Sequence, residues 1–447
     1  MNCKIIKTVP EEQIFWQQEE KSVQFEGDCM HSVELYPDVT EQTVVGFGGA
    51  FTEASAHTFA GLSEEEKKKV IEGYFGEDGL RYNVGRIPMH SCDFGLGNYT
   101  YVEEGDETLS SFSVSHDEKE ILPMITMARE EALRTGQQMK FLTAPWSPPA
   151  FMKTNGEMNH GGRLKKEYYE LWAKYFVKFL KAYKEAGVEI SYLTVQNEPE
   201  AVQTWDSCEY NAVEEVDFIK NYLAKELKDA GLSHIKILVW DHNKEGMYRR
   251  TKEAILAAGE QSNLIGGVAV HWYTGDHFDA IRAVRKAFPD KSVFFAEGCV
   301  EFSRFSPSDE VLMAEMYAHD MIGNFGAGVE AFFDWNLLLD EKGGPNHVGN
   351  FCAAPMMLKK DKATKRLSYY YIGQLSRYVR PGAKMMYTST YCKDLETVGF
   401  VNPDGERVVI ILNPTDKTLP AAIRHNEGGQ GVYHVFAPHS IATICFT

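Results

Sequence analysis

The feature that most constrains the fold is an alternation, from about residue 44 to about residue 375, of short β-branched runs with longer amphipathic stretches. This alternation is typical of repeated βα units, which build a parallel sheet. Eight runs have the length and composition of strands, at residues 43–47, 82–87, 140–143, 191–196, 235–240, 267–271, 292–296 and 329–333. Because eight strands close a parallel barrel, we predict an α/β fold with a (β/α)₈ TIM barrel.

Helices are predicted between these strands. The clearest covers residues 165–186, where apolar side chains recur at helical spacing, and Gly187 follows as a residue that ends helices. Its apolar stripe consists of Leu171, Trp172, Tyr175, Phe176, Phe179, Leu180 and Tyr183, which we interpret as core. The other predicted helices are 63–74, 117–134, 210–230, 247–258, 277–288, 309–323 and 366–376.

The character of the chain changes after Arg380-Pro381-Gly382. Strand-like runs at 395–401, 407–412, 433–436 and 441–446 are separated by turns, and runs at 14–17 and 32–36 near the N-terminus resemble them. We therefore predict an attached all-β sandwich domain formed from both chain termini. The predicted parts are residues 1–43 (N-terminal strands of the sandwich), 44–376 (barrel) and 377–447 (C-terminal sandwich).

Charge limits the partners that the chain can bind. Acidic residues number 64 against 46 Lys and Arg, a net charge of −18, and no basic run would track phosphates. Nucleic acid and anionic membranes are therefore poor partners. The first ten residues lack the apolar stretch of a secretory signal, and no segment is apolar enough to span a bilayer, so we expect a cytoplasmic protein without membrane insertion. These features leave the oligomeric state unknown.

The eight cysteines are scattered and form no C-x-x-C pair, so we predict free thiols rather than disulfides. Two short segments, 90–93 and 241–242, combine His with Cys or Asp, but neither has a second ligand at helical spacing. The glycine-rich segment 46–49 lacks the Lys-Ser/Thr pair of a phosphate-binding loop. We predict no metal site. The cysteines are Cys3, Cys29, Cys92, Cys208, Cys299, Cys352, Cys392 and Cys445.

Two glutamates end predicted barrel strands, where barrel enzymes place their active sites. Glu198 closes the run 191–198 and Glu297 closes the run 292–297, which by our count are the ends of strands four and seven. Two carboxyls facing one ligand suit glycoside hydrolysis, in which a gap of about 5–5.5 Å favours retention and about 6.5–9.5 Å favours inversion. A single strand-end Glu is more often a salt-bridge partner. The pair, in barrel register, favours catalysis.

Sugar rings present apolar faces bordered by hydroxyls, so their pockets combine aromatic platforms with fixed polar groups. Asn197, directly before Glu198, is placed to bind a sugar hydroxyl, and Tyr273 to orient an ionised Glu297. For the aromatic residues, core packing is an equally good interpretation when each is taken alone. The further candidates are Trp146, Trp335, and Asp93 with Phe94, which follow other strands.

Several motifs, in order and spacing from Gly46 to the C-terminus, resemble glycoside hydrolase family 30, the glucosylceramidase-like family. They are GFGGAFTEA (46–54), GRIPM (85–89), SCDF (91–94), APWSPP (144–149), VQNEP (195–199), HWY (271–273), DWN (334–336), and GGPN (343–346) with Asn350. The resemblance implies a TIM barrel with a β-sandwich built from both chain ends, a retaining double displacement, and no metal or organic cofactor.

The resemblance also implies roles for individual residues. Glu198 corresponds to the acid/base and Glu297 to the nucleophile, while Arg86 and His271 correspond to supports behind them. The residues expected to hold the cleaved sugar are Asp93, Trp146, Asn197, Tyr273, Trp335 and Asn350.

We therefore predict a retaining β-glycosidase that acts on glucosides or xylosides through a covalent glycosyl-enzyme, with a β-linked glycoside or oligosaccharide as its partner. The cleaved sugar could be glucose, xylose or fucose. The visible N-terminus lacks the leader of lysosomal and secreted relatives, which favours diffusible β-glycosides over a ceramide lipid. Three alternatives stay open: an endo-acting β-1,6-glucanase of the same family, a non-catalytic carbohydrate-binding protein, and a metal-dependent barrel hydrolase.

Overall fold

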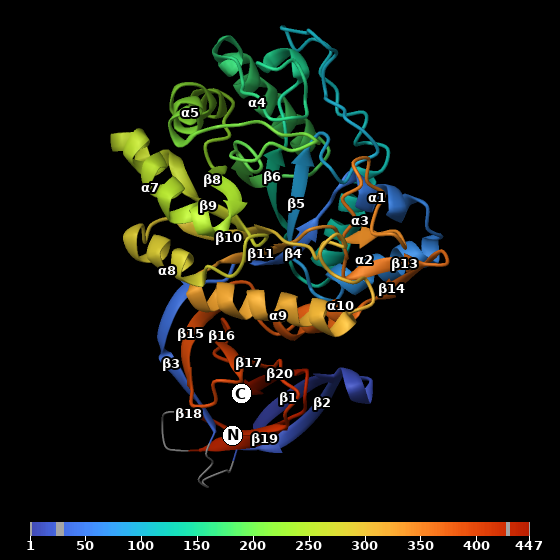
Figure 1. Cartoon of the computed structure of the whole chain (residues 1–447), viewed down its shortest axis with the longest axis vertical. Coiled ribbons are helices and arrows are strands. Elements are labelled where there is room, and N and C mark those ends of the chain that lie inside the picture. Colours follow the sequence, from blue (N-terminus) through green and yellow to red (C-terminus); the bar gives the residue numbers. More distant parts are fainter. Residues whose placement is uncertain (1, 24–30, 426–429, 447) are drawn as a thin grey trace.

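The chain forms a closed barrel and an attached β domain, described by a computed structural model over residues 2–23, 31–425 and 430–446 (Figure 1). The eight barrel strands are parallel, in the ring order β10-β11-β4-β5-β6-β7-β8-β9. They are β4 (Gly46–Ala50), β5 (Val84–Met89), β6 (Lys140–Pro145), β7 (Ile190–Thr194), β8 (Lys236–Asn243), β9 (Ile265–His271), β10 (Ser292–Glu297) and β11 (Ala331–Asp334). Each overlaps one predicted run, so the predicted barrel is confirmed.

The interior of the barrel is a packed core rather than a channel, as is usual for this architecture. Alternate residues of the strands point inward and are almost completely shielded from solvent, which explains why short apolar runs were readable as strands. The inward cluster consists of Val84, Leu142, Tyr192, Leu238, Ala269, Phe294, Ala296, Ala331 and Phe333.

All eight predicted helices are present, although the one at 210–230 passes through a π-helical turn and the one at 165–186 starts with a 3-10 turn. Gly187 follows α4 in the left-handed region, with φ of +82°. The helices are α2 (Glu64–Phe75), α3 (Ile121–Arg134), α4 (Tyr169–Glu185), α5 (Ala212–Phe218), the π-turn Ile219–Leu223, α6 (Ala224–Asp229), α7 (Met247–Ala258), α8 (Phe278–Ala287), α9 (Glu310–Ala327) and α10 (Leu367–Ser376). Short 3-10 turns cover Pro10–Glu12, Ala150–Met152, Lys166–Tyr168, Lys244–Gly246 and Gly259–Leu264.

Two elements of the barrel region were not predicted. Helix α1 (Glu53–Ala60) follows β4 directly, and the Thr52 hydroxyl caps it by accepting a hydrogen bond from the Ser55 N–H at 3.1 Å. A small sheet of β12 (Leu338–Leu339), β13 (Met356–Lys359) and β14 (Lys362–Lys365) follows β11. Its strands are only two to four residues long, too short to show a strand periodicity in the sequence.

The β domain is built from both ends of the chain, as predicted, and both termini lie in it (Figure 1). Nine strands run in the order β19-β18-β3-β15-β16-β17-β20-β1-β2, and β1 pairs antiparallel with β20, so that Cys3 faces Phe446. Ile5, Val33 and Ile444, from separate parts of the sheet, share one apolar core. The strands are β1 (Asn2–Val9), β2 (Ile14–Ser22), β3 (Ser32–Thr43), β15 (Lys384–Thr390), β16 (Glu396–Val401), β17 (Arg407–Asn413), β18 (Leu419–His425), β19 (Gly431–Phe436) and β20 (Ser440–Phe446).

The β domain is joined to the barrel through buried polar contacts on α10. The Gln374 amide donates to Thr8 Oγ1 at 2.9 Å, and Thr443 Oγ1 donates to Gln374 Oε1 at 2.7 Å. One buried side chain thus ties the N-terminal strand, the C-terminal strand and a barrel helix together. The boundaries at residues 43 and 376 stay predictions.

Two further expectations concern thiols and membranes. The seven cysteines within the described ranges are free thiols and all are buried, while Cys29 lies outside the described residues. Among the helices that the structure describes, none combines the length and the apolar character needed to cross a lipid bilayer.

The connection from β5 to α3 is long for a barrel loop and carries Asp93, so its anchoring matters for the barrel mouth. Asp117, fully buried near its end, accepts hydrogen bonds from the hydroxyls of Tyr99 (2.9 Å), Tyr101 (2.5 Å) and Tyr183 (2.6 Å). Burial raises the pKa of Asp117, although the three tyrosine hydroxyls oppose that rise. This carboxylate fixes the loop against α4.

We predict that Asp117→Ala lowers the free energy of unfolding by roughly 2 kcal/mol or more, because the buried hydroxyls of Tyr101 and Tyr183 lose their acceptor. Chemical denaturation of the purified protein measures this change. Asp279→Ala is the control, since the Asp279 side chain is 95% exposed and should contribute less than about 1 kcal/mol. Equal, small losses in the two variants would contradict the anchoring role.

Candidate active site

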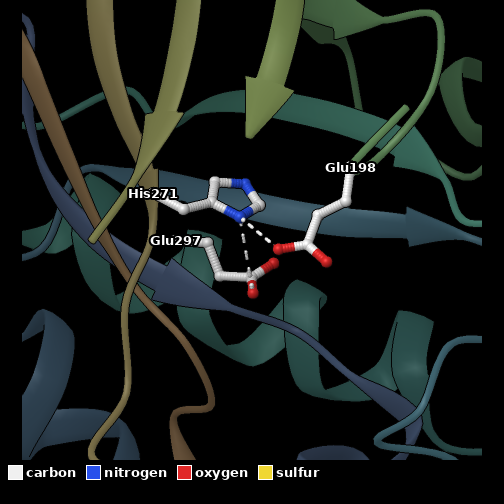
Figure 2. Close-up of side chains that lie close together, drawn as sticks. All are labelled: Glu198, His271 and Glu297. Atoms are coloured by element: carbon white, nitrogen blue, oxygen red, sulfur yellow. Dashed lines mark hydrogen bonds and ion pairs between the residues drawn. The ribbon is translucent and has the colours of Figure 1, made fainter. Parts of the chain in front are cut away.

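The two strand-end glutamates meet at the mouth of the barrel (Figure 2). Glu297 is the last residue of β10, and Glu198 lies four residues beyond β7. His271, at the end of β9, lies between them: its Nδ1 is 3.3 Å from Glu198 Oε1 and 3.8 Å from Glu297 Oε1. These three atoms all lie within 4.8 Å of one another. The sequence could not determine the distance between the two carboxyls, and in the structure this distance is short.

The backbone at Glu198 adopts a conformation that non-glycine residues seldom take, with φ of +46°. Neighbouring strands hold it there. The Glu198 N–H donates to the Asp241 carbonyl at 2.9 Å, and the Asn197 N–H donates to the Pro145 carbonyl at 2.8 Å. Such strain persists only where the surroundings determine it, and it aims the Glu198 side chain at the cavity.

A buried arginine lies beneath the carboxylates. Arg86, on β5, is fully shielded from solvent and forms ion pairs with Glu297 at 3.3 Å and Asp241 at 3.1 Å. It also donates hydrogen bonds to Asn197 Oδ1 and to the Ala296 carbonyl, each at 2.8 Å. A guanidinium stays charged at any working pH, so Glu297 has a permanent positive neighbour.

His271 is held by a second buried carboxylate. Its Nε2 lies 3.0 Å from Asp241 Oδ1, and Asp241 also accepts from the Thr194 hydroxyl at 2.7 Å. Burial lowers the pKa of His271, but the charge of Glu297 and the hydrogen bonds with Asp241 and Glu198 raise it to about 9. Burial likewise acts against the charge of Asp241, yet Arg86 and His271 bring its pKa below the ordinary value. The imidazolium is therefore the form present at neutral pH.

Tyr273 contacts the other side of Glu297. Its hydroxyl donates to Glu297 Oε1 at 2.8 Å, and its backbone N–H donates to Asn243 Oδ1 at 2.9 Å, which fixes the residue after β9. A hydrogen bond to a carboxylate favours its ionised form. Tyr273 thus both positions Glu297 and stabilises its charge.

Two tryptophans form an aromatic wall of the cavity. Trp146 and Trp335 stack with ring centroids 5.1 Å apart and planes 17° apart. Phe94 packs edge-on against Trp335 at 6.0 Å, is fully buried and is not among the described residues that line the cavity. Its ring supports Trp335, and contact between Phe94 and the ligand stays a prediction.

Asp93 and Asn350 form a polar pair that also lines the cavity. Asn350 Nδ2 donates to Asp93 Oδ2 at 2.9 Å, whereas Asp93 Oδ1 is buried without a hydrogen-bond partner among the residues that the structure describes. Burial, and then the nearby charges of Glu297 and Glu198, raise the pKa of Asp93 to about 8. A buried oxygen in need of a partner is suited to a ligand hydroxyl.

The two glutamates, the two tryptophans, Tyr273 and the Asp93–Asn350 pair line one cavity of about 180 Å³. Arg86 and His271 lie behind its surface rather than on it. The lining consists of Asp93, Trp146, Asn197, Glu198, Gln203, Trp205, His242, Asn243, Tyr273, Glu297, Cys299, Glu301, Trp335 and Asn350. Six of these were not predicted, namely Gln203, Trp205, His242, Asn243, Cys299 and Glu301. Asn243 directly ends β8, so the strand-end rule could have found it, but the irregular loop that carries Gln203 and Trp205 has no such signal.

Comparison with known proteins places the chain. The family model described as the glycosyl hydrolase family 30 TIM-barrel domain matches residues 44–379, and the model described as the family 30 beta sandwich domain matches residues 382–444. The chain belongs to glycoside hydrolase family 30. It is therefore a glycoside hydrolase, as the sequence predicted.

Three relatives illustrate the range of the family. The chain is 33% identical to a protein named lysosomal acid glucosylceramidase from Mus musculus, over 87% of this chain and 78% of that one. It is 26% identical to a protein named endo-1,6-beta-D-glucanase neg1 from Aspergillus fumigatus, over 83% and 79%. The crystal structure of SrfJ from Salmonella typhimurium superimposes with a TM-score of 0.95 at 40% identity, covering 100% of this chain and 99% of that one.

The pKa values of Glu198 and Glu297 depend on burial and on the charged groups beside them. Burial raises the pKa of Glu297, and the charge of Glu198 adds to that rise, while His271 and Arg86 oppose it. Burial also acts on Glu198, but the hydrogen bond with His271 and the charges of His242 and His271 bring its pKa below the ordinary value. Burial lowers the pKa of His242, so its imidazole is uncharged at neutral pH and His271 is the charged histidine beside Glu198.

Glu198, His271 and Glu297 are also the one group of described residues that offers three metal-ligand atoms close together. A histidine must be neutral to bind a metal, whereas His271 is cationic at neutral pH with its pKa near 9. Arg86, 3.3 Å from Glu297, already supplies a positive charge to this carboxylate. The arrangement suits proton transfer better than ion binding, and the predicted absence of a metal stays a prediction.

We predict that Tyr273→Phe shifts the acidic limb of the pH dependence of kcat/KM to higher pH. The hydroxyl lowers the pKa of Glu297, so its removal raises that pKa, and ionisation then requires a higher pH. A hydrogen bond to a charged group is worth about 1.5–3 kcal/mol, which corresponds to roughly one to two pH units.

Tyr82→Phe is the matched control for this shift. The Tyr82 hydroxyl is buried and has no hydrogen-bond partner within the described part of the chain, so its loss should leave the acidic limb in place. An unshifted limb in Tyr273→Phe, or the same shift in both variants, would contradict the assigned role.

Proposed function

We propose that this family 30 enzyme is a retaining β-glycosidase, with Glu297 as nucleophile and Glu198 as acid/base. In the first step, a Glu297 carboxylate oxygen bonds to the anomeric carbon while Glu198 donates its proton to the glycosidic oxygen, and the bond from that carbon to the leaving group breaks. In the second step, Glu198 takes a proton from water, the water oxygen bonds to the anomeric carbon, and the ester bond to Glu297 breaks.

The observation that carries the proposal is the short gap between Glu198 and Glu297. Their facing oxygens lie within 4.8 Å, which supports direct attack by a carboxylate. An inverting enzyme needs a wider separation, about 6.5–9.5 Å, to admit a water molecule between the carboxyl and the sugar. The proximity therefore favours retention.

The division of roles rests on the neighbours of Glu297 and on the family motif around Glu198. Glu297 contacts the permanent charge of Arg86 at 3.3 Å and the hydroxyl of Tyr273 at 2.8 Å, both of which stabilise the anion that a nucleophile must be. Glu198 contacts the His271 imidazolium at 3.3 Å and Gln203 Nε2 at 3.4 Å, which position its carboxyl. The acid/base role of Glu198 is carried over from the family motif VQNEP and not from its pKa, because burial raises that pKa but the hydrogen bond with His271 and the nearby histidine charges together bring it below the ordinary value.

The cleaved sugar would bind between the aromatic wall and the polar pair. Trp146 and Trp335 offer a face for the C–H surface of the ring, and Asp93 with Asn350 offers partners for its hydroxyls. Asn197, held by Arg86, would hydrogen-bond the 2-hydroxyl in the transition state. We propose a glucoside or xyloside as the substrate, and the name of the mouse relative supports glucose.

A second candidate is endo-acting cleavage of β-1,6-glucan. The Aspergillus fumigatus relative, named for that activity, matches 83% of this chain at 26% identity. A non-catalytic carbohydrate-binding role is disfavoured because Glu198, Glu297 and Asn197 are all present and contact one cavity.

We expect the purified protein to hydrolyse one member of a panel of 4-nitrophenyl β-glycosides: glucoside, xyloside, fucoside and galactoside. Absorbance of released nitrophenol gives the rate, and ¹H NMR of the first-formed sugar gives its anomer. A β-product supports retention, whereas an α-product would show inversion and overturn the mechanism. Silence across the panel, with turnover of β-1,6-linked oligomers, would favour the endo-acting candidate.

We predict that Glu297→Gln abolishes turnover of every substrate, because no nucleophile remains. Glu198→Gln should instead slow poor leaving groups by about 10² to 10⁴ and spare activated aryl glycosides, whose leaving groups need little protonation. Steady-state kinetics on a good and a poor leaving group measure the difference. Equal losses on the two substrates in Glu198→Gln would refute the role assignment.

A further inference from the structure

The barrel ring divides into two arcs of four strands. The first arc, β11-β4-β5-β6, carries four of the residues proposed above for the cleaved sugar: Trp335, Asn350, Asp93 and Trp146. The second arc, β7-β8-β9-β10, carries both catalytic glutamates. Lining residues of the second arc that the proposed mechanism does not use are Trp205, His242 and Glu301, together with Gln203 beside Glu198.

All four residues line the cavity, and two of them lie directly beside the acid/base. Gln203 Nε2 lies 3.4 Å from Glu198 Oε2, and His242 Nδ1 lies 3.6 Å from Glu198 Oε1. Glu198 donates its proton to the leaving-group oxygen, so the groups around it face the leaving group rather than the cleaved sugar. Trp205 follows Gln203 on the same loop, and Glu301 lies four residues after Glu297.

The chemistry of this side is that of a sugar site. Trp205 is half-buried and packs against the aromatic cluster of the cavity, so part of its ring is left as a platform. The same cavity is lined by Gln203, Glu301 and His242, whose Nδ1 is buried without a hydrogen-bond partner among the described residues. Sugar hydroxyls can satisfy these groups, whereas an alkyl chain would leave them desolvated and unpaired.

The loop that carries Trp205 is firmly held. Asp206 accepts from the Ser91 hydroxyl at 2.6 Å, and the buried Lys153 ammonium donates to the Ser207 carbonyl at 2.6 Å. The His160 N–H donates to the Gln203 carbonyl at 2.8 Å. These contacts tie the loop after β7 to the loops after β5 and β6, so the platform is positioned before a ligand arrives.

We propose that Trp205, Gln203, His242 and Glu301 form a leaving-group subsite that binds a sugar, so that the substrates are β-linked disaccharides or oligosaccharides rather than glycosides of apolar chains. This proposal rests on the proposed glycosidase function and names its substrate class. Trp205 is the specificity-determining residue, because it provides the aromatic surface of the subsite.

The experiment compares three kinds of substrate that share one cleaved sugar: a β-glycosyl fluoride, disaccharides with β-1,3, β-1,4 and β-1,6 linkages, and an octyl β-glycoside. Fluoride is too small to reach the subsite, so its hydrolysis reports the catalytic groups alone. In the full-length protein, Trp205→Ala should lower the ratio of kcat/KM for the best disaccharide to kcat/KM for the fluoride by about tenfold.

Two further variants are the matched controls. Trp205→Phe keeps an aromatic surface and should lower that ratio by less than about threefold. Val202→Ala changes a neighbouring side chain that is 61% exposed and outside the cavity lining, and should leave the ratio unchanged.

The failures are distinguishable. A wild-type protein that does not hydrolyse the fluoride would refute the glycosidase function itself. Turnover of the fluoride without turnover of any disaccharide, or a larger kcat/KM for the octyl glycoside than for every disaccharide, would overturn the subsite proposal alone. The same is true if Trp205→Ala changes the rates for fluoride and disaccharide equally.

Discussion

The site depends on one buried positive charge. Placing a guanidinium in the interior costs several kcal/mol unless carboxylates and hydrogen-bond acceptors surround it. Arg86 meets that requirement only when β5, β7, β8 and β10 are in register, since Asn197, Asp241, Ala296 and Glu297 supply its partners. The same contacts set the positions of Asn197 and Glu297 in the cavity. Closure of the barrel and assembly of the active site are therefore one structural event.

The two arcs of the barrel contribute different sets of residues to the cavity. Groups on β11-β4-β5-β6 and groups on β7-β8-β9-β10 line one cavity, and Glu198 and Glu297 both belong to the second arc. The first set is held by stacking of Trp146 on Trp335, and the second by polar contacts of the loop around Trp205. Variation in the second set can change the leaving group without disturbing the groups that hold the cleaved sugar, which is consistent with the different substrates for which family 30 relatives are named.

The sequence predicted what depends on periodicity. Buried parallel strands produce continuous apolar runs, so all eight barrel strands were found, and the strand-end rule then singled out Glu198 and Glu297. It could not place side chains that depend on loop geometry, as at Trp205, or on pairing across the barrel, as at Asp241, which contacts both Arg86 and His271. The packing of Phe94 against Trp335 could not be predicted either, because these residues follow barrel strands that are far apart in the sequence. The sequence analysis also missed strands β1, β15 and β18, although each of them pairs with the next strand along the chain.

The charges of the buried cluster explain how it can serve both chemical steps. Arg86 and His271 are positive and Asp241 is negative, while Asp93, with its pKa near 8, is protonated at neutral pH. The cluster is then neutral when Glu198 and Glu297 share one proton. In the proposed covalent intermediate, Glu297 is esterified and Glu198 is ionised, so the negative charge has moved from one to the other and the total is unchanged. An environment that stabilises an anion at either position fits this transfer: Arg86 and Tyr273 contact Glu297, and His271 contacts Glu198. A strong preference for one position would stabilise one step at the expense of the other.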